Sequence, residues 1–169
     1  MQCSGPASKR THDRTMITPD APSARPPHQA TLMTPAELAH DMELVMRVMP
    51  MPKDSNGNGD IFGGWIMSQV DLAGCVLPAR IAKGKIATVA VNEFVFKSAV
   101  SVGDLLSFYA RVERVGKTSI TVHVEVWAER RPSDPILVKV TEARATYVAI
   151  DHEGKPRPIP QTQAGVSSA

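Results

Sequence analysis

The segment NGNGDIFGGWIMSQVDLAGCVLPARI (residues 56–81) decides the fold, because a glycine-rich turn in it leads directly into a long apolar run. From Gly63 to Lys83 the run has the length of a helix, and apolar side chains occur nearly all round it, which is typical of a helix buried on most faces. Pro78 interrupts this pattern, since a proline inside a helix loses a hydrogen bond and clashes with the carbonyl four residues earlier. We therefore predict a long buried helix with a kink or an early end near Pro78.

Five strand-like runs flank this helix in the sequence. One of them, 43–52, precedes the helix and ends in prolines, and four follow it at 85–98, 104–116, 117–130 and 136–151. In the run 117–130, one set of side chains is apolar and the alternate set is mostly polar, which indicates one buried face: Ile120, Val122, Val124 and Val126 form the apolar set, and Thr121, His123, Glu125 and Trp127 the other. The short links between the last three runs predict an antiparallel meander.

The expected fold class is α+β, with an antiparallel sheet wrapped around one long central helix. A sheet of this size needs a cover on one face, and the segment 63–83 is the only long helix in the pattern. Because that helix is apolar on more than one side, we expect its outer face to contact a second subunit. Thr34, Pro35 and Glu37 further predict a capped helix start before the first strand.

Composition limits the classes of function. The 169 residues are 43% hydrophobic and 21% charged, which is typical of one globular domain. The formal net charge is +2, and residues 1–30, with four Lys/Arg and two Asp/Glu, account for all of it, so nothing indicates nucleic-acid binding. We expect residues 1–33 to be a disordered extension, 34–160 the folded domain and 161–169 a tail.

Cysteine content and hydropathy bear on disulfides, metal sites, membrane spans and the cellular compartment of the protein. Cys3 and Cys75 are the only cysteines, too few for a disulfide framework or a zinc site, so no bound metal ion is expected. Polar residues interrupt the run 63–82 too often for a membrane span, and the beginning of the sequence lacks the apolar region of a secretory signal. We therefore expect a cytoplasmic protein without a resident cofactor.

Two carboxylates stand out at the apolar run. Asp71 lies inside the run and Asp60 lies just before it. An ionised carboxylate in an apolar setting is costly unless it is paired or hydrogen-bonded. Asp71 could face water on a helix edge, be a buried acid bonded to a serine or a backbone amide, or be a functional acid in a cleft, and the residues alone leave all three interpretations open.

Gly63 and Gly64 stand at the expected start of the helix, where backbone amides are free. These amides and the helix dipole attract negative charge, and glycine lets a ligand approach the backbone closely. The pair could therefore form part of an oxyanion hole, or it could simply make a turn.

Three segments, MPKDSNGNGDIFGGWIMSQVD (51–71), GKIATVAVNEFVFKSAVSVGDLL (84–106) and VEVWAE (124–129), together resemble the YciA-type acyl-CoA thioesterases of the hotdog-fold superfamily. The resemblance extends over about residues 43–160. It implies a long helix wrapped by an antiparallel sheet, an acyl-CoA substrate and active sites at the interface of a dimer. It also implies a homohexamer built as a trimer of dimers.

By this resemblance, Asp71 matches the catalytic aspartate of the helix, and Asp60 matches a loop position that holds Asp or Asn. Gly63 and Gly64 fall where the start of the helix polarises the thioester carbonyl. Asp71 of one chain would face Asp60 and Gly64 of the other. The aspartate would activate water as a general base or attack the thioester as a nucleophile.

Further side chains complete the expected substrate site: Asn58, Trp65, Ser68, Lys97, Ser98 and Lys117. Lys97, Lys117 and Arg130 are candidates for the cationic rim that the phosphates of coenzyme A require. Ser98 and Ala99 stand where the family usually has a basic residue and a proline, so the coenzyme contacts depart from the family pattern here.

The sequence also bears on other candidate residues and on other functions. Cys75 is interpreted as a core thiol and His123 as a surface or interface residue. A non-catalytic acyl-CoA sensor would usually carry a DNA-binding module, for which the N-terminal segment is too short and too rich in proline. A hotdog dehydratase or hydratase would need a histidine in the loop–helix region, and none lies between His40 and His123.

Overall fold

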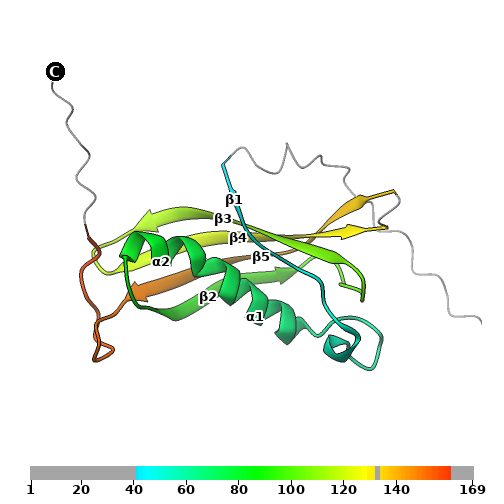
Figure 1. Cartoon of the computed structure of the whole chain (residues 1–169), viewed down its shortest axis with the longest axis horizontal. Coiled ribbons are helices and arrows are strands. Elements are labelled where there is room, and N and C mark those ends of the chain that lie inside the picture. The colour runs from blue at the N-terminus through cyan, green and yellow to red at the C-terminus, as the bar shows by residue number, and fades with distance from the viewer. Residues whose placement is uncertain (1–40, 132–133, 161–169) are drawn as a thin grey trace, which may run out of the picture.

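The computed structural model describes residues 41–131 and 134–160. Two consecutive helices pack on one face of a five-stranded antiparallel sheet with the strand order β1-β3-β4-β5-β2 (Figure 1). The strands are β1 (Glu43–Val48), β2 (Ile86–Phe96), β3 (Leu105–Val115), β4 (Ser119–Arg130) and β5 (Ile136–Ala149). These bounds confirm the five predicted strands and the β3–β4–β5 meander. The helix start predicted at Thr34 lies outside the described residues.

The helix predicted over 63–83 is divided into α1 (Gly63–Gly74) and α2 (Val76–Ala82), with Cys75 between them. Pro78 lies in the first turn of α2, where its missing amide hydrogen costs no helical bond. The predicted interruption near Pro78 is therefore confirmed. A short 3-10 turn, Pro52–Asp54, precedes α1. No helix in the described part of the chain combines the length and the apolar character that a membrane crossing requires.

The core lies between the helix pair and the sheet. It takes Ile66 and Val70 from α1 and the predicted apolar set of β4, all no more than 1% exposed. The predicted alternation in β4 is confirmed for Thr121, His123 and Glu125, which lie on the other face and are only partly buried. Trp127, predicted with them, donates a hydrogen bond to Glu125 but is itself buried, at 4% exposed. A register slip of one residue would expose the whole apolar set. Since each buried Val or Ile contributes about 1.5–3 kcal/mol, the strand register is strongly fixed.

Large apolar side chains on α1 and β2 stay exposed in the single chain. They include Met67 and Leu72 on α1 and Val89, Val95 and Phe96 on β2, each 47–58% exposed. Among the described strands, β2 pairs only with β5, so the backbone groups of its other edge have no partner in this part of the chain. An exposed apolar edge strand is a template for pairing with another chain. This surface favours the prediction that the outer face of the helix contacts a second subunit.

Gly74 marks the closest approach of α1 to the sheet. A Cβ atom added at this position would overlap the hydroxyl oxygen of Tyr147, a β5 residue that is only 1% exposed. Glycine is therefore required by the packing of the tyrosine beneath the helix.

We expect the Gly74→Ala variant to unfold with a free energy about 1–3 kcal/mol lower than that of the wild type, because the methyl group overpacks the core against the Tyr147 hydroxyl. Gly64→Ala is the matched control, since no heavy atom lies within 4 Å of a Cβ added there. This control should be neutral or slightly stabilising. Urea unfolding at one fixed protein concentration measures both, and equal stability of the two variants would contradict the packing argument.

Candidate active site

The carboxylate of Asp71 is partly buried and reaches from α1 to the sheet. Thr88 on β2 donates a hydrogen bond from Oγ1 to Oδ1 of Asp71 at 2.7 Å. The hydroxyl of Tyr147 donates to the backbone carbonyl of Asp71 at 3.0 Å and lies 3.4 Å from Oδ1. No described residue donates to the second oxygen, Oδ2. The carboxylate is therefore held through one oxygen and open at the other.

The first turn of α1 presents backbone amides without acceptors. The amides of Trp65 and Ile66 both donate to the carbonyl of Phe62, at 3.0 and 3.2 Å. The amides of Gly63 and Gly64 have no acceptor among the described residues. The positive end of the helix dipole lies at the same place. This arrangement suits a carbonyl oxygen that gains negative charge during a reaction.

A pocket of about 350 Å³ opens beside the start of α1. Asp60 and Gly63 line it from the loop and the helix, and Phe96, Lys97 and Ser98 line it from the end of β2 and the segment after it. The carboxylate of Asp60 accepts no hydrogen bond from the residues that the structure describes, so it is available to a ligand in the pocket. Four of the predicted site residues are therefore brought together here: Asp60, Gly63, Lys97 and Ser98.

An ion pair fixes the wall of this pocket. The side chain of Asp104 is only 7% exposed, and it accepts hydrogen bonds from Nε of Arg130 at 3.1 Å and from the amide of Ser101 at 3.0 Å. Arg130 also donates to the carbonyl of Ala99. Arg130, one of the candidates for a phosphate contact, is thus occupied in holding the loop that follows β2.

Asp71 does not line the pocket of its own chain. It follows Gly63 by eight residues, which is about 12 Å along the helix axis. The open carboxylate and the free amides are therefore two separate half-sites within one protomer. Asp71 can meet Asp60 and Gly64 in the way that the sequence predicts only if a second chain supplies them.

The other predicted contacts are distributed over the molecule. Trp65 packs against the core, and the hydroxyl of Ser68 donates to the Trp65 carbonyl at 2.7 Å. Asn58 is exposed in the turn before α1, and Lys117 is exposed in the turn between β3 and β4. None of these four side chains lines the pocket beside Asp60. Their contact with substrate stays a prediction.

Thr88 and Tyr147 belong to the candidate site through their hydrogen bonds to Asp71, and sequence reasoning missed both. Each lies in a strand far from Asp71 in sequence, by 17 and 76 residues respectively. The one available signal was a large polar residue in the alternating buried positions of β5, where Ala145 and Ala149 flank Tyr147. Burial, and then the negative charge of Asp71, raise the pKa of Tyr147, so its hydroxyl keeps the proton that it donates.

Cys75, which the sequence predicted to be a core thiol, is only partly buried and packs against the edge of the core. Burial, and then the charge of Asp71, raise the pKa of this thiol above its ordinary value. Its Sγ lies 3.1 Å from the carbonyl of Leu72. A thiol whose pKa is raised is a poor nucleophile, so the Asp71 carboxylate is the better candidate for a reacting group in this region.

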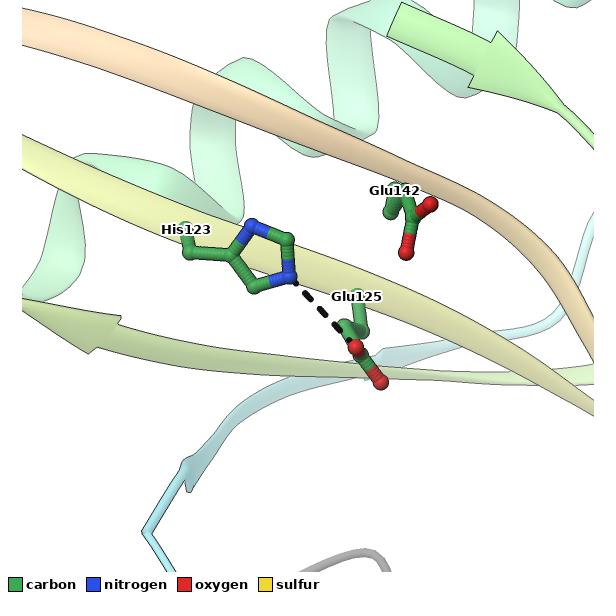
Figure 2. A group of neighbouring side chains, drawn as sticks. All are labelled: His123, Glu125 and Glu142. Carbon is green, nitrogen blue, oxygen red and sulfur yellow. Dashed lines mark hydrogen bonds and ion pairs between the residues drawn. The ribbon is translucent and has the colours of Figure 1, made fainter. Parts of the chain in front are cut away.

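A second polar cluster lies on the face of the sheet that is turned away from the helices (Figure 2). His123, Glu125 and Glu142 bring possible metal-ligand atoms within 4.8 Å of one another. However, Nζ of Lys139 lies 2.6 Å from a carboxylate oxygen of each glutamate. This ammonium group already supplies the positive charge that a metal ion would bring, so the cluster is an ion-pair network.

Lys97 belongs to the same network. Its Nζ lies 2.6 Å from Oε1 of Glu142. Hydrogen bonds from Lys139 and Lys97 lower the pKa of Glu142 from its ordinary 4.5 to about 2. Lys97 borders the pocket beside Asp60, but its charge is already neutralised, which weakens its predicted role as a phosphate contact.

Comparison with known proteins places the chain among thioesterases. A family model described as the thioesterase superfamily matches residues 58–133, which include both helices and β2 to β4. The acyl-CoA thioester hydrolase YciA of Salmonella typhimurium is 48% identical over 130 residues, which are 76% of this chain and 98% of that protein.

Solved structures agree with this result. The hexameric thioesterase y2039 from Yersinia pestis shares 46% identity at a TM-score of 0.67, over 71% of this chain and 97% of that chain. The hexameric hotdog fold thioesterase Cj0915 of Campylobacter jejuni shares 42% identity at a TM-score of 0.67, over 70% and 90% of the two chains. The predicted fold class is therefore confirmed.

The ion-pair network makes a testable contribution to acid stability. Because the pKa of Glu142 in the folded chain is about 2, below the ordinary 4.5, its ionised form stabilises the fold above pH 4.5, and this contribution is lost as the pH falls towards 2. We expect the unfolding free energy of the wild type to fall more steeply than that of Glu142→Gln over this range. The partial exposure of the ion pairs limits the difference to about 1 kcal/mol. Urea unfolding at matched pH values measures it, and parallel curves would contradict it.

Proposed function

The chain belongs to the YciA-type acyl-CoA thioester hydrolases of the thioesterase superfamily, and from this premise we propose that it hydrolyses acyl-CoA at a site shared by two protomers, with Asp71 as the reacting group. The observation that carries the proposal is the geometry of the Asp71 carboxylate. Thr88 holds one of its oxygens, and the other is free to act on water or on the substrate.

The reaction adds water across the thioester bond. Either Oδ2 of Asp71 removes a proton from water as the water attacks the carbonyl carbon, or the carboxylate attacks that carbon itself and water later cleaves the resulting anhydride. In both routes the carbon–sulfur bond breaks and the coenzyme leaves as a thiol. The amide of Gly64 polarises the carbonyl, which contributes about 3 kcal/mol to transition-state stabilisation. The reaction requires no resident cofactor or metal ion.

The exposed apolar surface supports the shared site. Pairing of β2 with β2 of a second copy would satisfy the unpaired backbone of this edge and cover Val89, Val95 and Phe96. The outer face of α1 would be covered as well. Asp60 and Gly64 of the partner subunit would then complete the half-site at Asp71. Since the relatives from Yersinia pestis and Campylobacter jejuni are hexameric, we propose a homohexamer built from three such dimers.

The dehydratase or hydratase alternative requires a histidine beside the acid. Among the described residues, His123 lies on the face of the sheet away from α1, and His152 lies in the turn after β5. Neither contacts Asp71. Hydrolysis by the carboxylate is therefore the better supported chemistry.

The central prediction concerns Asp71→Asn. The asparagine keeps an oxygen that accepts the Thr88 hydrogen bond, but it can neither take a proton nor attack the thioester. We expect kcat for thiol release from acyl-CoA to fall by about a hundredfold or more, with KM and the circular dichroism spectrum little changed. Asp134→Asn, at an exposed loop position, is the control for loss of a negative charge. Unchanged turnover of a panel of acyl-CoA thioesters by Asp71→Asn would overturn the assignment.

Tyr147 is proposed as a positioning residue for this carboxylate. Its hydroxyl bonds the Asp71 carbonyl and lies near Oδ1, so it fixes both the backbone and the side chain of the reacting group. Because the same hydroxyl fills the space beside Gly74, its packing role and its hydrogen-bonding role can be separated by substitution.

We expect Tyr147→Phe to lower kcat by about tenfold with little change in KM, because it removes one hydrogen bond to the reacting group. In Gly74→Ala/Tyr147→Phe the alanine methyl group occupies the space of the lost hydroxyl, at 3.4 Å from the ring carbon Cζ and from Cγ2 of Val124. The double variant should therefore regain stability relative to Gly74→Ala while its kcat stays low. If kcat recovers together with stability, Tyr147 acts only through packing and the positioning role is wrong.

A further inference from the structure

Residues 98–101 follow β2, and the first three of them line the pocket beside the start of α1. The carbonyl of Val100 accepts a hydrogen bond from the amide of Ile61 at 2.8 Å, and Asp60 forms a β-bridge with Ser101. Val100 and Ile61 are only 3% and 5% exposed, so this contact is buried. The place of Asp60 at the pocket therefore depends on the backbone of residues 98–101.

An ion pair fixes the same segment from the sheet. Asp104 directly precedes β3 and Arg130 is the last residue of β4, and the antiparallel register of these two strands places them side by side. Oδ2 of Asp104 accepts hydrogen bonds from Nε of Arg130 and from the amide of Ser101. The guanidinium of Arg130 also donates to the carbonyl of Ala99. The two side chains together thus hold the segment on either side of Val100.

Burial distinguishes this ion pair from the pairs on the surface of the sheet. The side chain of Asp104 is 7% exposed, whereas the two side chains of the Arg47–Glu129 pair are 46% and 32% exposed. A buried carboxylate that loses its cation is costly, because neither water nor another charge replaces the lost partner without movement of the backbone. We therefore expect loss of the Arg130 guanidinium to displace residues 98–101, and with them Asp60.

The contacts of the ion pair lead to Asp60 and not to the reacting carboxylate of the same chain. The hydrogen bonds that Asp71 accepts from described residues come from Thr88 and Tyr147. In the proposed shared site, the Asp60 of one chain completes the half-site at Asp71 of the partner subunit. A change at Arg130 would then be felt in the other protomer.

We propose that Arg130 is a positioning residue: with Asp104 it holds residues 98–101, which place Asp60 for the reaction at Asp71 of the partner subunit. This inference rests on the proposed function, because it assigns the support of one of its two half-sites. It also gives Arg130 a role within the fold in place of the phosphate contact that the sequence suggested.

Replacement of the guanidinium gives the first test. We expect Arg130→Gln to lower kcat for thiol release from acyl-CoA by about tenfold or more, because a small displacement of a half-site is costly to the rate. Arg130→Lys keeps a cation beside Asp104 but cannot form both sets of hydrogen bonds, so its kcat should be intermediate. Arg47→Gln, which breaks the exposed pair with Glu129, is the matched control and should keep the wild-type kcat. Wild-type kcat in Arg130→Gln would overturn the inference.

Mixed oligomers show in which protomer Arg130 acts. In a dimer of one Asp71→Asn chain and one Arg130→Gln chain, one site combines an intact Asp71 with an intact Arg130 from the other chain. Random pairing of the two co-expressed chains should therefore restore about a quarter of the wild-type activity, well above the mean of the two variants measured separately. A role of Arg130 in stability alone, or on Asp71 of its own chain, predicts no such gain.

Co-expression of Asp71→Asn with Asp60→Ala is the reference pair for the mixed oligomers. A gain in this pair without a gain in the Arg130→Gln pair would overturn the inference and leave the shared site intact. If neither pair gains, the shared site itself is wrong and the inference fails with it. Full activity of Asp60→Ala would also overturn the inference, since Asp60 would then need no positioning.

Hydrogen–deuterium exchange tests the support of Asp60 without turnover. In Arg130→Gln the peptide that contains the Ile61 amide should exchange faster than in the wild type, because its acceptor belongs to the released segment. The peptide that contains Ile150, whose amide donates to the carbonyl of Lys85, is the internal control and should be unchanged. Equal exchange of the Ile61 peptide in both proteins would overturn the inference. Absence of hydrolysis by the wild type would instead overturn the proposed function.

Discussion

A carboxylate inside an apolar helix has to be hydrogen-bonded, and this requirement links α1 to the sheet. Thr88 on the edge strand and Tyr147 on its neighbour both reach Asp71. The tyrosine can lie beneath the helix only because residue 74 has no side chain. The first helix also ends at this glycine, and α2 begins at Val76, two residues before Pro78. The hydrogen bonds of Asp71 thus tie α1 to β2 and β5, in addition to the apolar contacts of the core.

The incomplete site around Asp71 and the exposed apolar surface of the single chain both point to a second copy. An open carboxylate and free helix-start amides about 12 Å apart cannot act on one bond. The surfaces of α1 and β2 beside both half-sites carry several large exposed apolar side chains, among them Met67, Leu72 and Phe96. Burying them against a second copy stabilises an oligomer and brings complementary half-sites together. Association through this surface would therefore both bury apolar area and complete the proposed active site.

Local sequence patterns predicted the elements of this fold, but they could not supply the contacts between elements. The alternation from Ile120 to Val126 was sufficient for β4, and Pro78 was sufficient for the interruption of the helix. Thr88 and Tyr147 escaped prediction because their hydrogen bonds depend on the registers of β2 and β5. The prediction for Lys97 lacked the same information: its partner Glu142 belongs to the strand that the register places beside it. An acid out of place in an apolar run is visible in a sequence, whereas the donors that hold it are not.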